Sequence, residues 1–133
     1  MGTRFNGKKL SGGFGRGPLL ISVEPISFFG GVDPKSGLII DRWHSLHNKS
    51  LKGVVLAVPR GKGSTVGSYV IYALSKNNVA PAALVLRERD IVIAAGCILG
   101  KIPSIELEVS KWAQLSNHSC ATVNGYEGYI EVD

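Results

Sequence analysis

A serine stands at the end of a glycine-rich turn, where an apolar stretch gives way to helical spacing. The apolar stretch covers residues 54–58, and in the turn Gly61 and Gly63 flank Lys62 directly before Ser64. Backbone N–H groups at a helix start lack partners, and the peptide dipoles there favour negative charge. The turn can therefore hold an anion or stabilise a negative charge that develops during a reaction. Serine is also a common helix N-cap, so on these residues alone a structural role stays equally open.

The residues after Ser64 have the spacing of an amphipathic helix. A helix over residues 65–76 is expected to end at Asn77 and Asn78, shortly before Pro81. One face of this helix is apolar and consists of Val66, Tyr69, Val70, Ala73 and Leu74. Ser64 is thus predicted to lie at a strand-to-helix corner.

Spacing excludes two nucleotide-binding motifs. The lysine of a P-loop is followed by Ser or Thr, whereas Gly63 follows Lys62 here, and Leu56 stands where the first glycine of the loop belongs. A second glycine cluster, residues 12–17, precedes the first strand-like run, which is the wrong order for a dinucleotide-binding turn. We expect residues 1–17 to form a flexible lead-in.

The composition indicates a single domain over residues 1–133. Of the 133 residues 44% are apolar, which is enough for a core. No run approaches the roughly 18 apolar residues of a membrane span, and no signal-peptide core is present, so we expect a cytoplasmic location and no membrane partner. Cys97 and Cys120 are too few for a disulfide framework and lack a metal-binding spacing, which predicts two reduced thiols and no metal on this chain.

The formal net charge of +5 suits an anionic substrate or partner. The basic residues are dispersed, however, and form no stripe with interleaved aromatic residues. Nucleic acid is therefore not an expected partner.

The remaining apolar runs predict a mixed α/β fold. Strands are expected over residues 19–23, 38–40, 54–58, 82–86 and 105–109. Asp90 is expected to cap a second helix, and Asn124-Gly125 to form the two-residue turn of a carboxyl-terminal hairpin. The alternation of strands and helices implies parallel crossovers. We predict a small, partly barrel-like mixed sheet with helices packed on one side, and a ligand site beyond the carboxyl ends of its parallel strands.

An ordered series of short motifs runs through most of the chain. The motifs are residues 29–34 with Gly37, Asp41 with residues 44–46, residues 50–53, residues 59–68 and residues 80–83. With these motifs the chain resembles the small subunits of the aconitase-X family, which are swivelling β/β/α domains. Ser45 departs from the pattern, because proline is expected there in many relatives, whereas the serine corner is intact.

The resemblance implies a hydro-lyase built as a heterodimer. A large subunit would carry a [4Fe-4S] cluster that acts as a Lewis acid on the leaving hydroxyl, and this chain would supply Ser64 as the proton acceptor. The implied reaction is dehydration of (R)-mevalonate 5-phosphate to trans-anhydromevalonate 5-phosphate in the archaeal mevalonate pathway of isoprenoid biosynthesis. Two cysteines are too few to hold such a cluster here, which agrees with this division of labour.

Further polar groups of the corner and of the preceding loops are expected to line the same cleft and to bind the substrate. They are Arg60, Gly61, Lys62, Gly63, Thr65, Ser68, Asp33, Asp41 and His44. Arg60 and Lys62 suit a phosphate or carboxylate, although exposed basic side chains are commonly just solvated. Asp33 is more typical of a turn cap than of a ligand contact.

Alternatives to this function remain. A hydrolase triad of Asp41, His44 and Ser64 is disfavoured, because the usual nucleophile elbow is missing. A related dehydratase would act on another hydroxy acid, such as a hydroxyproline, with the same fold and serine. In a different class, the chain would be a non-enzymatic module that grips an anion on a partner and assists assembly.

Energetics indicate that Ser64 cannot become basic on the isolated chain. An alkoxide base needs on the order of 7 kcal/mol of selective stabilisation, whereas a helix terminus contributes about 0.3–2 kcal/mol. The rest would come from N–H groups around Gly63 and Thr65, from Lys62 or Arg60, and from a dry interface with the large subunit.

Overall fold

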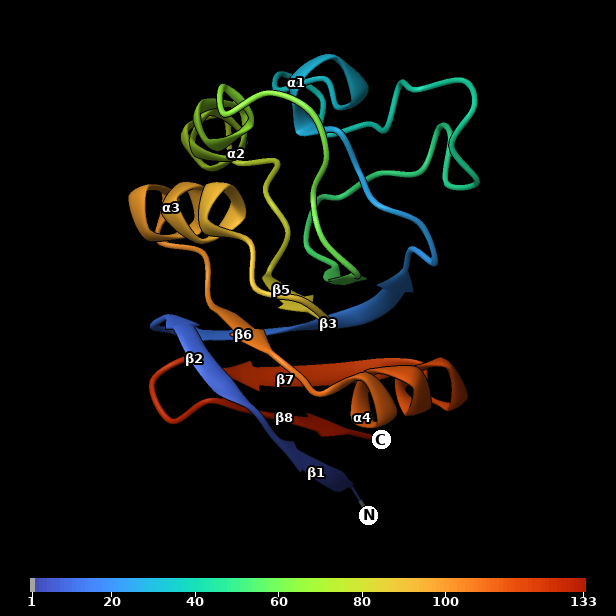
Figure 1. Ribbon diagram of the computed structural model, residues 1–133, viewed down its shortest axis with the longest axis vertical. Coiled ribbons are helices and arrows are strands. Elements are labelled where there is room, and N and C mark those ends of the chain that lie inside the picture. Colours follow the sequence, from blue (N-terminus) through green and yellow to red (C-terminus); the bar gives the residue numbers. More distant parts are fainter. Residues whose placement is uncertain (1) are drawn as a thin grey trace.

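The chain folds into two layers of strands and one of helices (Figure 1). The computed structural model describes residues 2–133. The middle layer is built on parallel pairing of β3 (Phe14–Ile21), β4 (Val55–Val58), β5 (Ala83–Leu86) and β6 (Ser104–Glu106). Helices α2 (Gly67–Lys76) and α3 (Ile91–Gly100) cover one face of this layer. The predicted mixed α/β class and parallel crossovers are confirmed.

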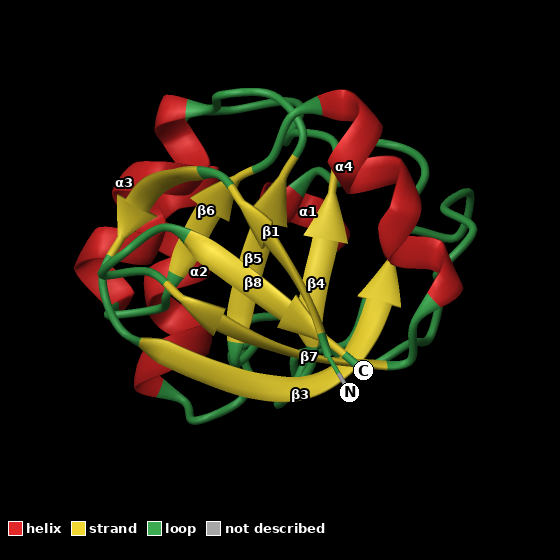
Figure 2. Ribbon diagram, turned by 90° about the horizontal axis from the view of Figure 1, so that it is seen from below, coloured by secondary structure: helices red, strands yellow, loops and turns green. Residues whose placement is uncertain are grey.

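An antiparallel layer covers the other face, and Figure 2 shows its strands crossing in front of β4 and β5. It consists of β1 (Thr3–Asn6), β8 (Tyr129–Val132) and β7 (Cys120–Asn124), in that order, followed by the first half of β3. At the opposite edge β2 (Lys8–Ser11) pairs with β6. The two edge strands, β1 and β2, are thus joined along the chain by Gly7 alone.

Strand β4 separates two apolar cores, because both of its faces are buried. Leu56 and Val58 belong to the core beneath α2 and α3. Val55 and Ala57 belong to the core between the two strand layers. An uninterrupted apolar run is typical of a parallel strand covered on both faces, so the sequence signal over residues 54–58 has a direct physical cause.

Two short helical segments close one end of the core between the strand layers. They are α4 (Val109–Ala113) and a 3-10 helix (Gln114–Asn117). The predicted strand over residues 105–109 is therefore wrong beyond β6. The cause is Trp112, which is buried and donates its Nε1–H to the carbonyl of Val85 at 3.1 Å, a tertiary anchor that no local alternation reveals.

Two further predictions, an apolar strand and a two-residue turn, are wrong. Residues 38–40 form no strand and make only isolated bridges, Val32 with Ile39 and Leu38 with Ser50. The carboxyl-terminal hairpin is present, but β7 and β8 are joined by four residues instead of a two-residue turn. The Asn124 side chain shapes this connection by accepting the N–H groups of Tyr126 and Glu127.

The expected flexible lead-in is also wrong, because strands occupy most of residues 3–17, while Met1 lies outside the described residues. The glycine cluster lets β3 approach other backbone closely. A Cβ at Gly15 would lie 2.0 Å from the carbonyl oxygen of Ala82, and one at Gly17 would lie 2.1 Å from that of Gly53. The glycines therefore meet a packing requirement set by residues distant in sequence.

We predict that Gly17→Ala destabilises the fold by about 1–3 kcal/mol or more, because the added methyl group overlaps backbone that cannot move aside. Thermal and urea unfolding measure the effect. Gly67→Ala is the matched control, since a Cβ there has its nearest neighbours at 3.6 and 3.7 Å. Equal stability of the Gly17 and Gly67 variants would contradict the close-approach account.

Candidate functional site

The serine corner begins where β4 leaves the middle layer. The carbonyl of Pro59 accepts the N–H groups of Arg87 and Glu88 at 3.2 and 3.0 Å, which keeps the chain beside the segment that follows β5. The corner thus lies beyond the carboxyl ends of β4 and β5, where ligands of parallel sheets usually bind. The expected position of Ser64 is confirmed.

Backbone and side-chain hydrogen bonds hold the corner from two sides. On one side Ile26 forms a parallel bridge with Gly61, donating to the carbonyl of Arg60 at 3.4 Å and accepting from Lys62 at 3.1 Å. On the other side the Oδ2 atom of Asp90 accepts the Gly61 N–H at 2.9 Å. The turn is therefore anchored immediately before Ser64.

Ser64 is exposed and performs a local structural task as well. Its Oγ accepts the N–H of Val66 at 3.1 Å, and its carbonyl accepts the N–H of Gly67, the first residue of α2, at 3.0 Å. The hydroxyl hydrogen and a second lone pair remain available for a ligand. The two interpretations of the serine, as helix-start cap and as reactive group, are thus compatible in one geometry.

Gly63 is required by the backbone at this point. Its φ of 90° lies in the region that favours glycine, and a Cβ there would lie 3.0 Å from the Ser27 Oγ. The glycine therefore allows the turn to bring Ser64 to the surface next to the short turn α1 (Phe28–Gly31).

A small hollow of about 80 Å³ lies next to Ser64. Its lining consists of Phe28, Gly61, Lys62, Gly63, Ser64, Gly67, Asp90, Val92 and Ile93. Sites that enclose a small molecule usually measure about 300–1,000 Å³. The hollow can hold part of a substrate and needs another surface to enclose the remainder.

The basic side chains of the corner already face acidic ones. The Arg60 Nε lies 3.6 Å from an oxygen of Glu88. Lys62 lies close enough to Glu24 for its charge to help lower the pKa of that carboxyl, after the larger effects of hydrogen bonds from Ser45. Only Lys62 of the two lines the hollow, so it is the better placed for an anionic group.

Other predicted binding residues have local partners. Asp33 accepts the Lys35 N–H at 3.0 Å and the Ser36 hydroxyl at 2.8 Å, and these two bonds, in that order, lower its pKa. Asp41 accepts the Trp43 N–H at 3.0 Å. Both carboxylates thus stabilise turns, and neither lines the hollow. Their contact with a substrate stays a prediction.

Thr65 and Ser68 are in the first turn after the corner. The Ser68 hydroxyl donates to the Thr65 carbonyl at 3.0 Å, while the Thr65 side chain is exposed. Neither residue lines the hollow, and substrate binding by either one also stays a prediction.

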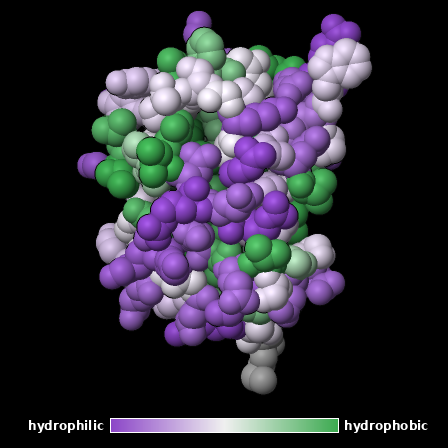
Figure 3. Space-filling model, viewed as in Figure 1, coloured by the Kyte–Doolittle hydropathy of each residue, from purple (hydrophilic) through white to green (hydrophobic). Residues whose placement is uncertain are grey.

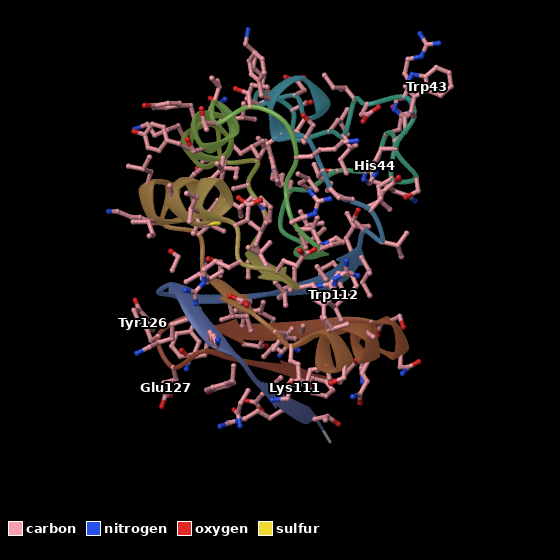
Figure 4. All side chains as sticks on the ribbon, viewed as in Figure 1. Trp43, His44, Lys111, Trp112, Tyr126 and Glu127 are labelled. Atoms are coloured by element: carbon pink, nitrogen blue, oxygen red, sulfur yellow. The ribbon has the colours of Figure 1, made fainter. Side chains whose placement is uncertain are left out.

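His44 is buried and faces Ser22. Its Nδ1 accepts the Leu46 N–H at 3.0 Å, so Nε2 carries the proton and donates to the Ser22 Oγ at 3.1 Å. Figure 4 shows His44 lying toward the body of the protein, on the loop whose outer tip carries Trp43. These contacts give His44 a loop-fixing task and leave the hydrolase triad without its base.

Sequence reasoning missed Glu24 and the second contact of Asp90. Glu24 accepts the Ser45 N–H at 2.7 Å and so ties the loop of residues 41–47 to the segment after β3. The sequence predicts Asp90 only as the cap of α3, a task that it performs by accepting the N–H groups of Val92 and Ile93. No local motif marks either tertiary contact.

Within residues 2–133, no group of three or more His, Cys, Asp or Glu side chains is arranged to hold a metal ion. Cys97 is fully buried, and desolvation raises its pKa to about 12, while Cys120 is exposed on β7. The described residues therefore do not fit an iron–sulfur cluster on this chain. None of the helices in this range is long and apolar enough to cross a membrane.

The layers and the glycine-lined serine corner define a three-layer β/β/α domain with an open site at the ends of its parallel strands. The chain belongs to the aconitase X swivel-domain family, because the sequence model of that family matches residues 4–132. It is 48% identical to the phosphomevalonate dehydratase small subunit of Methanosarcina acetivorans over 130 residues, 97% of this chain and 90% of that protein. It is 44% identical to the subunit of the same name from Thermococcus onnurineus, with 98% of each chain covered.

Solved structures agree with this assignment. The crystal structure of Thermococcus kodakaraensis aconitase X in its holo form superposes with a TM-score of 0.89 at 40% identity, covering 98% of each chain. The solution NMR structure of a UPF0107 protein gives a TM-score of 0.89 at 35% identity, covering 98% of this chain and 99% of that one. The predicted swivelling β/β/α fold is therefore confirmed.

The hydrogen bonds of Glu24 predict a pH dependence of stability. The pKa of this carboxyl is lowered from its ordinary 4.5 in the folded protein. Its contribution to the free energy of unfolding is therefore present above about pH 4.5 and is lost as the pH falls through the pKa of the folded state. In unfolding measurements between pH 3 and 7, Glu24→Gln should lose less stability on acidification than the unmodified chain.

Asp33 and Asp133, whose pKa values are also lowered by hydrogen bonds, are present in both proteins, so their effects cancel in the comparison. Two superimposable pH profiles would show that the Glu24 contact contributes nothing.

Proposed function

We propose that this chain is the small subunit of a hydro-lyase that removes water from mevalonate 5-phosphate to give trans-anhydromevalonate 5-phosphate. The observation that carries the proposal is the exposed Ser64 hydroxyl beside a hollow too small to enclose a substrate. The names of the relatives, phosphomevalonate dehydratase small subunit, support the substrate. The site is complete only when a large subunit covers it.

Ser64 acts as the proton acceptor in this proposal. A C–H bond next to the carbon that bears the hydroxyl breaks, its proton passes to the alkoxide form of Oγ, and its electron pair forms the double bond as the hydroxyl leaves as hydroxide. The proton on Oγ then combines with the hydroxide, which releases water and restores the alkoxide. The Val66 N–H already donates to Oγ at 3.1 Å and is therefore in place to stabilise negative charge there. The positive end of α2 and the nearby Lys62 act in the same direction.

These local effects are insufficient without a partner. A hydrogen bond to a charged group contributes about 1.5–3 kcal/mol, and the helix terminus about 0.3–2 kcal/mol, against the roughly 7 kcal/mol that an alkoxide base requires. Exclusion of water strengthens each of these interactions. Closure by the large subunit is thus part of the catalytic chemistry, and the isolated chain is inactive.

The surface near the corner suits such a partner. The corner and the segments linked to it by hydrogen bonds, directly or through Glu24, carry exposed apolar side chains. We call them the apolar rim: Val23, Phe29, Trp43, Val66, Tyr69 and Ile91. Trp43 is 88% exposed, and Figure 4 shows it at the tip of a loop that projects from the body. Figure 3 shows apolar side chains over α3 as well, where Ile98 and Leu99 are exposed. Exposed apolar side chains in such groups are typical of protein contacts.

The iron–sulfur cluster belongs to the large subunit in this proposal, because the described residues of this chain offer no ligand set for it. When bound there, it supplies a Lewis acid for the leaving hydroxyl. The part of this chain is to orient the substrate through the corner, exclude water and accept the proton.

Ser64→Ala should abolish dehydration by the complex, lowering kcat by at least about 100-fold, because the proton acceptor is lost. The assay uses the coexpressed, anaerobically purified complex with mevalonate 5-phosphate, and with a hydroxyproline as the competing substrate. Ser116→Ala, at an exposed serine of the 3-10 helix, is the matched control. Full activity of the Ser64 variant would remove this residue from the mechanism, and turnover of the hydroxyproline alone would replace the substrate.

Trp43→Ala should weaken binding of the large subunit by about 10- to 100-fold, because an exposed aromatic anchor at an interface often contributes 2 kcal/mol or more. Titration calorimetry or surface plasmon resonance measures the dissociation constant. Tyr126→Ala is the control, since Tyr126 is 62% exposed and lies at the opposite end of the molecule in Figure 4. An unchanged dissociation constant for the Trp43 variant would place the interface elsewhere.

A further inference from the structure

Asp90 connects the serine corner to the start of α3. We propose that Asp90 is a positioning residue, whose carboxylate fixes the backbone of Gly61 and thereby sets the position of Ser64. This inference rests on the proposed function, because it concerns the same serine. It assigns to Asp90 a task beyond the capping of a helix.

The Gly61 N–H points away from Ile26. The bridge between Ile26 and Gly61 is formed by two hydrogen bonds, which Ile26 makes with the Arg60 carbonyl and the Lys62 N–H. The N–H of Gly61 therefore points to the other side, where a continuation of β5 would supply an acceptor. β5 ends at Leu86, and the chain turns into α3 instead. The Oδ2 of Asp90 supplies the acceptor instead, and it lies 2.9 Å from the Gly61 nitrogen.

The carboxylate is itself held in place. Its Oδ1 accepts the N–H groups of Val92 and Ile93 at 3.0 and 3.1 Å, so three backbone donors fix the two oxygens. A carboxylate with three such partners on two elements can adopt only one orientation. Asp90 therefore transmits the position of α3 to the corner.

Gly61 also packs closely against Asp90 and Ile93. A Cβ on this residue would lie 3.2 Å from Oδ2 of Asp90 and 3.2 Å from the Cδ1 of Ile93. Ser64 follows after only two residues, and both of them line the hollow together with Asp90. A displacement of Gly61 therefore changes the position of the Ser64 hydroxyl directly, and a shift of about 1 Å can reduce a reaction rate by about 100-fold.

The two contacts of Asp90 can be separated by Asp90→Asn. Asparagine caps helices as well as aspartate does, so Oδ1 can still accept the N–H groups of α3. The amide nitrogen then replaces Oδ2 and presents a donor to the Gly61 N–H, which breaks only the link to the corner. Asp90→Ser is a second variant of the same kind, because its short hydroxyl can cap the helix but does not reach Gly61.

The experiment measures kcat, KM and the thermal midpoint of the complex with its large subunit. Both Asp90 variants should lower kcat by about 10- to 100-fold, with KM changed less than about twofold. Ser75→Ala is the matched control, because the Ser75 hydroxyl links α2 to α3 at the far end, donating to the Gly100 carbonyl at 2.6 Å. This control should lower the thermal midpoint and leave kcat unchanged.

The proposal is overturned if both Asp90 variants keep the kcat of the unmodified complex. It is also overturned if the Ser75 control loses as much kcat, for a given drop in the thermal midpoint, as the Asp90 variants do. A readout independent of activity separates it from the proposed function. In NMR spectra of the full-length chain, Asp90→Asn should shift the amide signals of residues 61–64, and Ser75→Ala should leave them in place. If Ser64→Ala is fully active, the proposed function fails, but the NMR readout still decides whether Asp90 positions the corner. Unshifted amide signals in Asp90→Asn would refute the positioning role.

Discussion

The burial of β4 on both faces is the constraint on which the other features depend. Leu56 and Val58 need the helix layer, and Val55 and Ala57 need the second strand layer, so neither core forms without this strand. Because the strand is enclosed, the chain can change direction only where the layer ends. The backbone groups exposed at that end must find partners, and Ile26 and Asp90 supply them. The serine corner is thus a consequence of how a doubly covered strand ends.

The same geometry makes the structural task of Ser64 compatible with the chemical task that we propose for it. The Val66 N–H that satisfies the start of α2 is also the donor that would stabilise negative charge on the Ser64 Oγ. The hydroxyl nevertheless faces solvent, beside a hollow of about 80 Å³. In the proposed function this open hydroxyl is inert in water and becomes basic only when water is excluded. The apolar rim is where a covering subunit would replace that water.

Local patterns predicted the parts of the fold that depend on local physics. The apolar run of residues 54–58, the helical spacing after Ser64 and the capping by Asp90 all appear in the structure. Two of the wrong predictions, the flexible lead-in and the strand beyond residue 106, concern contacts between residues far apart in the chain. Gly15 and Gly17 indicated a flexible segment until their approach to Ala82 and Gly53 was known. The bond between Gly61 and Asp90 joins residues 29 positions apart, and no spacing rule reveals such a pairing.

The central claim is that this chain completes an active site that neither subunit possesses alone. The most direct test is to titrate the chain into a fixed amount of the large subunit under anaerobic conditions and to measure loss of water from mevalonate 5-phosphate. Neither subunit alone should turn over substrate, and activity should rise with added chain until every large subunit is occupied. Turnover by the isolated chain, or by the large subunit without it, would contradict the account.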